Sequence, residues 1–191
     1  MSQQVGSVTS PRVSPRLVVF IGVFFAATSA VLIKASAAHP LAIAFYRMLF
    51  SSILLIPQLQ GTGLRRLRSL SGRQWRLSII SGVFLGFHFA TWISSLSFTS
   101  VASATVLVNT HPVLVVVFGL LFLRERIPWD AAAWMILGLA GSLLLSLAGL
   151  RGTEGQAVGN LLAFGGAIAA AGYMLAGRAV RQDVDTRVYT F

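Results

Sequence analysis

Six apolar stretches, each close to the length of a membrane-spanning helix, occupy most of this chain. Because an α-helix rises about 1.5 Å per residue, about 20 apolar residues cross a hydrocarbon core of roughly 30 Å. The pattern therefore predicts an all-α fold, a polytopic membrane helix bundle. The predicted spans are residues 17–38, 40–59, 77–98, 101–123, 131–150 and 161–177.

The positive charges between the spans predict their orientation. When the spans are threaded through a membrane in order, every arginine outside them except Arg151 falls on the side of the N-terminus. Cytoplasmic loops carry an excess of Lys and Arg. We therefore expect an integral protein of a bacterial-type plasma (inner) membrane with a cytoplasmic N-terminus. The arginines on that side are Arg12, Arg16, Arg65, Arg66, Arg68, Arg73, Arg76, Arg124, Arg126, Arg178, Arg181 and Arg187.

The composition excludes several classes of protein. Hydrophobic residues make up 55% of the chain and charged residues 10%, which leaves too little polar surface for a soluble domain. The net charge of +10 would suggest nucleic acid in a soluble protein, but here the basic residues lie between spans, beside anionic lipid. The lipid bilayer is the expected partner, and no nucleic acid is expected. Without cysteine the chain has no thiolate ligands, and we expect neither cofactor nor metal.

The third predicted span carries the clearest candidate for a binding site. Polar and aromatic side chains recur there at i, i+3, i+4 and i+7, on one helical face. They are His88, Thr91, Trp92 and Ser95. Because lipid cannot satisfy polar groups, this stripe should face protein or a water-filled cavity. A substrate site and a simple hydrogen bond from His88 to a neighbouring helix are both compatible with it.

The fourth predicted span contains a proline and a second polar set. Thr105, Asn109 and Pro112 lie at i, i+4 and i+7, with His111 beside the proline. Proline lacks an amide hydrogen, so the carbonyl of Val108 loses its helical donor and the helix kinks. Transporters commonly bind polar substrates at such breaks. A kink that serves packing alone is the alternative.

Two cations lie within the predicted spans. Lys34 is about 6 Å from the end of the first span, and its long stem can reach the lipid headgroups. Arg47 lies about 10 Å inside the second span, where its guanidinium must find water, carbonyl groups or an anion. A cavity-facing role and a structural role for Arg47 remain equally open.

Two further patterns concern packing and catalysis. Small residues four apart in the fifth and sixth spans predict close helix packing. No carboxylate pair, metal-binding histidine motif or serine elbow is present, so we predict no enzyme and no catalytic residues. The small-residue pairs are Gly138 with Ser142, Gly165 with Ala169, and Gly166 with Ala170.

Three segments together resemble the EamA domain of the drug/metabolite transporter (DMT) superfamily. They are HPLAIAFYRMLF in the second span, FLGFHFATWISSLSF in the third and TSVASATVLVNTHPVLVVVFGLLFLRERI through the fourth. The resemblance implies ten spans in two inverted five-helix repeats. It implies that residues 16–150 form the first EamA repeat and that residues 151–191 begin an incomplete second repeat with its first helix. Residues 1–15 lack any periodicity and are predicted to be a disordered cytoplasmic N-terminus.

The resemblance also implies a function, that of a secondary, non-ATP transporter, here an exporter of small metabolites or drugs by alternating access. Its partner would be a small-molecule substrate, and no pattern indicates an oligomeric state. The alternative is a noncatalytic membrane assembly subunit or an inactive transporter fragment. The candidate substrate-binding residues are Arg47, His88, Thr91, Trp92, Asn109 and His111, with Pro112 as the helix kink.

Overall fold

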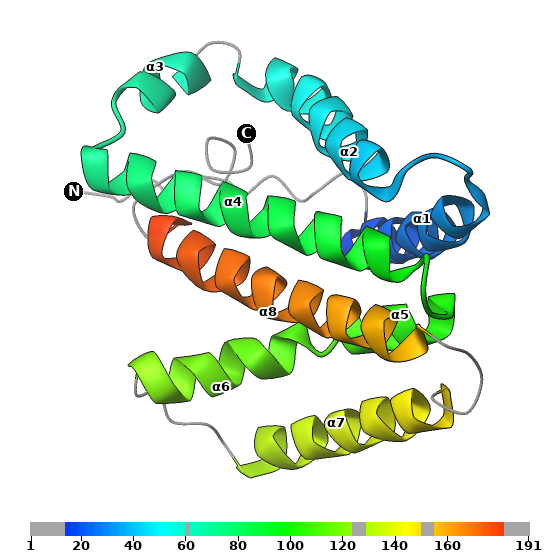
Figure 1. The fold of residues 1–191 in the computed structure, drawn as a ribbon. Helices are drawn as coiled ribbons and strands as arrows, with labels where there is room; N and C mark the ends of the chain where they lie inside the picture. Colours follow the sequence, from blue (N-terminus) through cyan, green and yellow to red (C-terminus); the bar gives the residue numbers. More distant parts are fainter. Residues whose placement is uncertain (1–13, 60–61, 124–128, 150–154, 182–191) are drawn as a thin grey trace.

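The computed structural model describes residues 14–59, 62–123, 129–149 and 155–181, and every regular element in these ranges is a helix. The predicted all-α fold is confirmed (Figure 1). The elements are α1 (Pro15–Ala35), α2 (Pro40–Leu55), the 3-10 helix η1 (Ile56–Leu59), α3 (Thr62–Arg68), α4 (Gly72–Ser95), α5 (Val101–Val108), α6 (His111–Leu123), α7 (Trp129–Gly149) and α8 (Gln156–Arg181).

The helices follow the predicted spans closely. In the described part of the chain, four stretches are long and apolar enough to cross a membrane: Arg16–Ala35, Gly72–Ser95, Val101–Leu121 and Gln156–Arg181. Two shorter apolar helices, Pro40–Leu55 and Ala132–Leu144, correspond to the second and fifth predicted spans. Residues 1–13 of the predicted disordered N-terminus lie outside the described residues. So do the loop arginines Arg124, Arg126, Arg151 and Arg187.

Local capping explains where several helices begin. Pro40 is at the start of α2, and the Nδ1 atom of His39 accepts a hydrogen bond from the backbone N–H of Leu41 (3.3 Å). A capping box begins α4: the Ser71 N–H donates to Gln74 Oε1 (2.8 Å) and the Gln74 N–H donates to Ser71 Oγ (3.3 Å). This box starts α4 before the predicted span at residue 77, because hydropathy does not register a polar cap.

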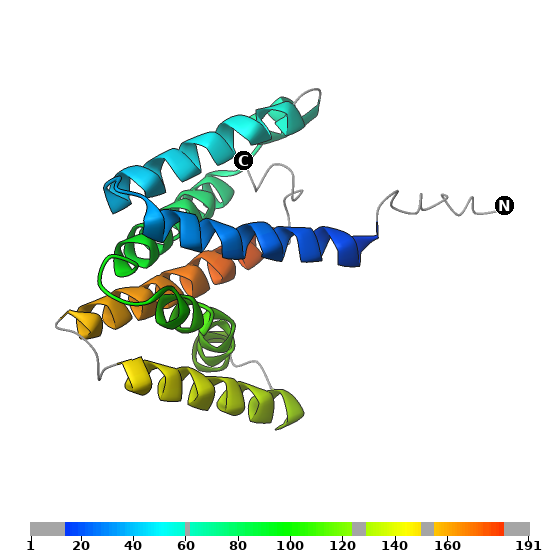
Figure 2. The same cartoon turned by 90° about the vertical axis from the view of Figure 1, so that its right-hand side faces the viewer.

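Helix α8 lies at the centre of the arrangement. It packs along α4 on one side and against α5 and α6 on the other, although it follows all three in the sequence (Figure 1). Helix α2 packs on α4, and α7 contacts α5 at the opposite edge. Viewed from the side, α1 extends away from the other helices toward the N-terminus (Figure 2). The bundle therefore joins α8 to helices from the predicted first repeat.

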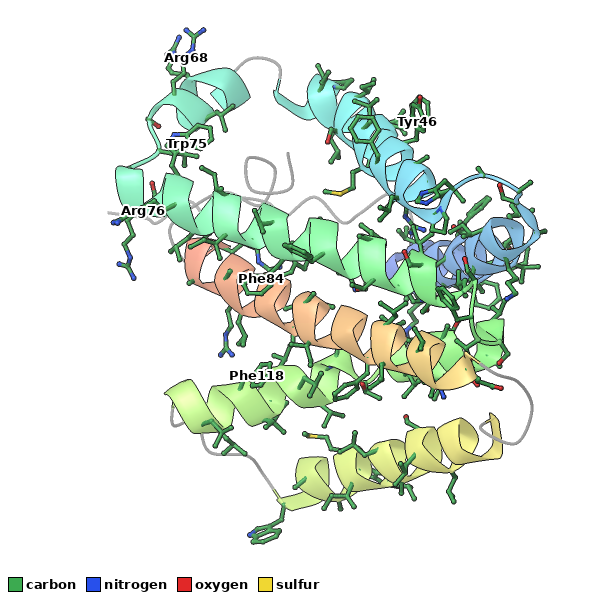
Figure 3. All side chains as sticks on the ribbon, viewed as in Figure 1. Tyr46, Arg68, Trp75, Arg76, Phe84 and Phe118 are labelled. Carbon is green, nitrogen blue, oxygen red and sulfur yellow. The ribbon has the colours of Figure 1, made fainter. Side chains whose placement is uncertain are left out.

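Glycines in α8 allow α4 to approach closely. A Cβ atom at Gly159 would lie 2.8 Å from the backbone nitrogen of Thr99, and one at Gly172 would lie 2.8 Å from the Phe84 ring. The side chain of Phe84 lies between α4 and α8 in Figure 3. At Gly166 the nearest atom would be Thr91 Oγ1, at 3.1 Å. Larger residues at these positions would push the two helices apart.

The predicted small-residue pairs differ in what they contact. Gly166 and Ala170 are both buried in α8, so this pair is used in packing. A Cβ atom at Gly165 or at Gly138 would meet nothing within 4 Å. The close-packing prediction was therefore wrong at those two glycines, because spacing identifies a helical face and not the helix that covers it. Ser142, four residues after Gly138, donates to the Gly138 carbonyl within its own helix (2.8 Å).

A short helix, α3, crosses between α2 and α4 and was not predicted from hydropathy. The Arg68 side chain points away from the bundle, and Trp75 lies between α3 and the first turns of α4 (Figure 3). Leu67, Leu70 and Trp75 line a cavity beneath α3. Within α3, Leu67 thus faces the cavity, while Arg65 and Arg68 are exposed.

Candidate binding site

The side chain of Arg47 connects α2 to α1 and α4. Its Nη1 atom donates to Ser29 Oγ of α1 (3.1 Å), and its Cζ atom lies 4.7 Å from the ring centroid of Phe89 and 5.7 Å from that of Trp92. The negative face of an aromatic ring attracts a guanidinium. All of these partners are neutral. Among the described residues, the positive charge of Arg47 therefore has no counter-ion.

Trp92 and His88 extend this contact along α4. Their rings are stacked, with 6° between the planes and 6.3 Å between the centroids. His88 Nδ1 lies 2.9 Å from the carbonyl oxygen of Gly166 in α8. Because a carbonyl can only accept, Nδ1 carries a proton in this contact. His88 therefore makes the hydrogen bond to a neighbouring helix that the sequence left open, and this bond does not use its Nε2 atom.

Thr91 lies on the same face but forms its hydrogen bonds within α4. Its Oγ1 atom donates to the carbonyl oxygen of Phe87 (2.7 Å), with that of His88 also in reach (3.3 Å). Threonine in a helix often bonds backward in this way. The stripe that begins at His88 thus faces α8, as expected of polar groups in a membrane helix, and the hydroxyl of Thr91 is already paired.

The fourth predicted span breaks into α5 and α6 at the proline. Helix α5 ends at Val108 and α6 begins at His111, one residue before Pro112. The Val108 carbonyl that proline releases does not stay free, because His111 Nδ1 lies 2.9 Å from it. Asn109 caps α5, and its side chain is exposed. The break thus pairs His111 with backbone and turns Asn109 outward.

Three of the predicted site residues are brought into one cluster. Arg47, Trp92 and His88 are linked by ring contacts. Phe89, Ser29 and Gly166 complete the cluster, and sequence reasoning missed them. No pattern within one helix identifies them, since each is defined by a contact with another helix.

Among the described residues, two buried side-chain polar atoms have no hydrogen-bond partner, and one of them belongs to this cluster. Trp92 is 8% exposed, and its Nε1 atom is buried without an acceptor. The Oγ1 atom of Thr105 in α5 is also buried and unpaired. Buried polar groups are nearly always hydrogen-bonded, so exceptions require an explanation. Trp92 packs against Ala30, Ala44 and Val108, which offer its indole no side-chain acceptor.

Arg47 and Phe89 line two different cavities. The larger cavity, of about 590 Å³, extends beneath α3 from Trp75 to Phe89. The second, of about 480 Å³, lies between α1 and α2 and extends from Ala38 past Arg47 to Phe50. The guanidinium of Arg47 rests on the Phe89 ring, so a residue that lines one cavity contacts a residue that lines the other. The cavities extend toward opposite ends of α2.

Lys34 binds protein, contrary to the expectation that its stem reaches the headgroups. Its Nζ atom donates to the carbonyl oxygens of Leu96 and Thr99, the latter at 3.1 Å. These carbonyls follow the end of α4, where backbone acceptors lack helical donors and a cation is favourable. The prediction failed because hydropathy cannot show that this turn lies next to α1.

Comparison with known proteins identifies the family. The model of the EamA-like transporter family matches residues 14–147, which is most of the chain. The chain belongs to this family. Within it, the matched EamA-like region contains α1 to α6 and most of α7, and therefore Arg47, Trp92 and His88, whereas Gly166 lies beyond it in α8.

Curated relatives of this EamA-like chain are transporters. The S-adenosylmethionine uptake transporter of Rickettsia bellii is 31% identical over 106 residues, 56% of this chain and 35% of the relative. The pseudopaline exporter of Pseudomonas aeruginosa is 28% identical over 131 residues, 68% of this chain and 44% of the relative. The chain thus spans between a third and a half of the length of these relatives. No solved structure matches it.

Proposed function

We propose that this chain supplies the cargo-binding part of a secondary, non-ATP transporter of small metabolites, and that the cargo binds at Arg47, Trp92 and His88. One observation carries the proposal: Arg47 lines a cavity between α1 and α2, and Phe89, which its guanidinium contacts, lines a second cavity that extends toward the other end of α2. Alternating access requires a binding position reached from each side in turn. The Nε1 atom of Trp92, in the same cluster, is a buried donor that no acceptor among the described residues satisfies.

The domain organisation belongs to the same proposal. Residues 16–150 would form one five-helix EamA repeat, and residues 151–191 would begin a second with α8. The close packing of α8 on α4 through Gly166 and Gly172, and on the turn after α4 through Gly159, supports an assembly in which the two repeats meet along this seam. In inverted-repeat transporters the substrate site lies at such a repeat interface.

Export is the direction that we propose, across a bacterial-type plasma membrane and with the N-terminus in the cytoplasm. The relative that matches the larger share of this chain is the pseudopaline exporter. The arginines of α3 and those of the first turns of α4 support the orientation, because such residues concentrate on the cytoplasmic side.

Binding measurements on the chain in lipid nanodiscs test the site. Radiolabelled S-adenosylmethionine and pseudopaline, the cargoes of the two relatives, serve as the first probes, followed by a panel of small metabolites. For any probe that binds, Trp92→Phe should weaken binding about three- to tenfold, because it removes one neutral hydrogen bond and keeps the aromatic packing.

Trp129 provides the matched control, since it is 91% exposed at the start of α7. Trp129→Phe should leave the dissociation constant unchanged within a factor of two. Equal effects of the two substitutions, or no effect of either, would refute a binding site at Trp92. Failure of the whole panel to bind would refute the cargo-binding role itself.

A further inference from the structure

We infer that the cargo carries a carboxylate group and that Arg47 binds it; this inference rests on the proposed function. The inference follows from the positive charge of Arg47, which no anion balances among the described residues. Arg47 makes one hydrogen bond among the described residues, from Nη1 to the neutral Ser29, and two contacts with neutral rings. A guanidinium presents several N–H donors in a rigid fork that matches a carboxylate in two-point geometry.

The helices around Arg47 offer no anion of their own. Within the described helices the sole acidic residue is Asp130, the second residue of α7, and α7 packs on α5. Helices α1, α2 and α4, which surround Arg47, contain neither aspartate nor glutamate. A charge at membrane depth is costly unless it is paired. A negative group that arrives with the cargo would provide that pair.

The neighbouring unpaired atoms favour the same ligand chemistry. The Nε1–H of Trp92 can only donate, and it is buried without an acceptor. The Trp92 ring lies 5.7 Å from the Arg47 Cζ atom, so both donors belong to one cluster. A carboxylate is acceptor-only when ionised and therefore suits two donors better than an amide or an amine does. An amine would instead place a second cation beside Arg47.

A lipid phosphate is the other possible source of an anion, and the position of Arg47 argues against it. Arg47 lies seven residues after Pro40, which is about 10 Å along α2 from the end of that helix. It lines the cavity between α1 and α2 and rests on Phe89, within the bundle. A soluble carboxylate can enter through this cavity and reach the guanidinium.

The test compares three probes of equal carbon skeleton: 4-phenylbutyrate, its amide and 4-phenylbutylamine. Equilibrium dialysis against the chain in phosphatidylcholine nanodiscs measures the three affinities, with empty nanodiscs to subtract partition into lipid. The wild type should bind the carboxylate at least tenfold more tightly than the amide, the ratio expected of a charge-assisted pair, and should bind the amine most weakly.

The decisive quantity is the ratio of carboxylate to amide affinity, because a loss of folded protein lowers both affinities equally. Arg47→Gln should reduce this ratio to about one, and Arg47→Lys should preserve part of it because the charge remains. Arg65→Gln, an exposed arginine of α3, should leave the ratio unchanged and so controls for general attraction of anions. Replacing half of the lipid by phosphatidylglycerol should also leave it unchanged.

Three outcomes would overturn the inference. The first is wild-type protein that binds the amide or the amine as well as the carboxylate. The second is Arg47→Gln with an undiminished ratio. The third is displacement of 4-phenylbutyrate by phosphatidylglycerol, which would assign Arg47 to lipid phosphate. If the ratio stays near one while Trp92→Phe still weakens cargo binding, the site stands and only the carboxylate assignment fails.

Discussion

Thr105 and Thr99 can be compared to measure how much an unpaired buried hydroxyl lowers the free energy of unfolding. Thr105 Oγ1 is buried without a partner, whereas Thr99 Oγ1, also buried, donates to Asn160 Oδ1 (2.9 Å). Thr105→Val removes an unsatisfied polar atom at constant shape, so it should raise the free energy of unfolding by about 1 kcal/mol. Thermal unfolding in detergent micelles, followed by circular dichroism, measures the change.

The same substitution at Thr99 should have the opposite sign. Thr99→Val deprives Asn160 of its donor and should lower the free energy of unfolding by about 1 kcal/mol. A Thr105→Val protein less stable than the wild type would mean that its hydroxyl has a partner in solution. Since the position of an unpaired atom depends on helix packing, neither effect can be foreseen from the stripe of polar residues alone.

At the scale of helices, the close packing of α8 predicts how replacing its glycines by alanine changes the free energy of unfolding. Gly159→Ala places a Cβ atom 2.8 Å from the backbone nitrogen of Thr99, where no side-chain rotation relieves the clash. It should lower the free energy of unfolding by about 1–3 kcal/mol, the usual cost of overpacking. Chemical unfolding in mixed micelles provides the measurement.

Gly165 supplies the control in the same helix. A Cβ atom there meets nothing within 4 Å, so Gly165→Ala should be neutral or stabilising by up to about 1 kcal/mol through helix propensity. If both alanines destabilise α8 equally, the seam does not depend on close approach at Gly159. Sequence spacing predicted close packing at Gly165, where it was wrong, and did not include Gly159, because the neighbours of each glycine depend on how α8 packs on the rest of the chain.

At the scale of the whole molecule, the orientation predicted from the arginines can be tested with single cysteines, since the chain has none. Cysteines are placed at Thr62, at the start of α3, and at Ala38, in the exposed turn between α1 and α2. Gly155, in the turn before α8, lies on the same predicted side of the membrane. Its φ of 96° would strain a cysteine, so Ala38 is used instead. An impermeant maleimide added to sealed cells should label Ala38→Cys and spare Thr62→Cys.

Labelling of Thr62→Cys in intact cells, at the rate seen after permeabilisation, would contradict the cytoplasmic placement of α3. Permeabilised cells provide the reactivity control for both positions.

The spans were predictable because hydropathy is a property of consecutive residues, and so was the break at Pro112, because proline acts on its own helix. It was also predictable that His88, Thr91, Trp92 and Ser95 share one face of a helix, because their spacing follows the helical period. What covers that face was not: Arg47 over Phe89, Lys34 on the Leu96 carbonyl and α8 against α4 all join residues distant in the sequence. These contacts depend on helix packing, which a single sequence does not encode in any local pattern.

The attachment of α1 gives it the mechanics of a lever. Lys34 pins one end to the turn after α4, and Ala30 rests in the cluster that contains Trp92, while residues 17–28 are exposed. From Lys34 to Arg16 the arm measures about 27 Å, so a tilt of about 10° displaces its free end by about 5 Å. The fulcrum moves far less. A large swing at one membrane face would therefore reach Trp92 as a small rotation of Ala30 against its ring.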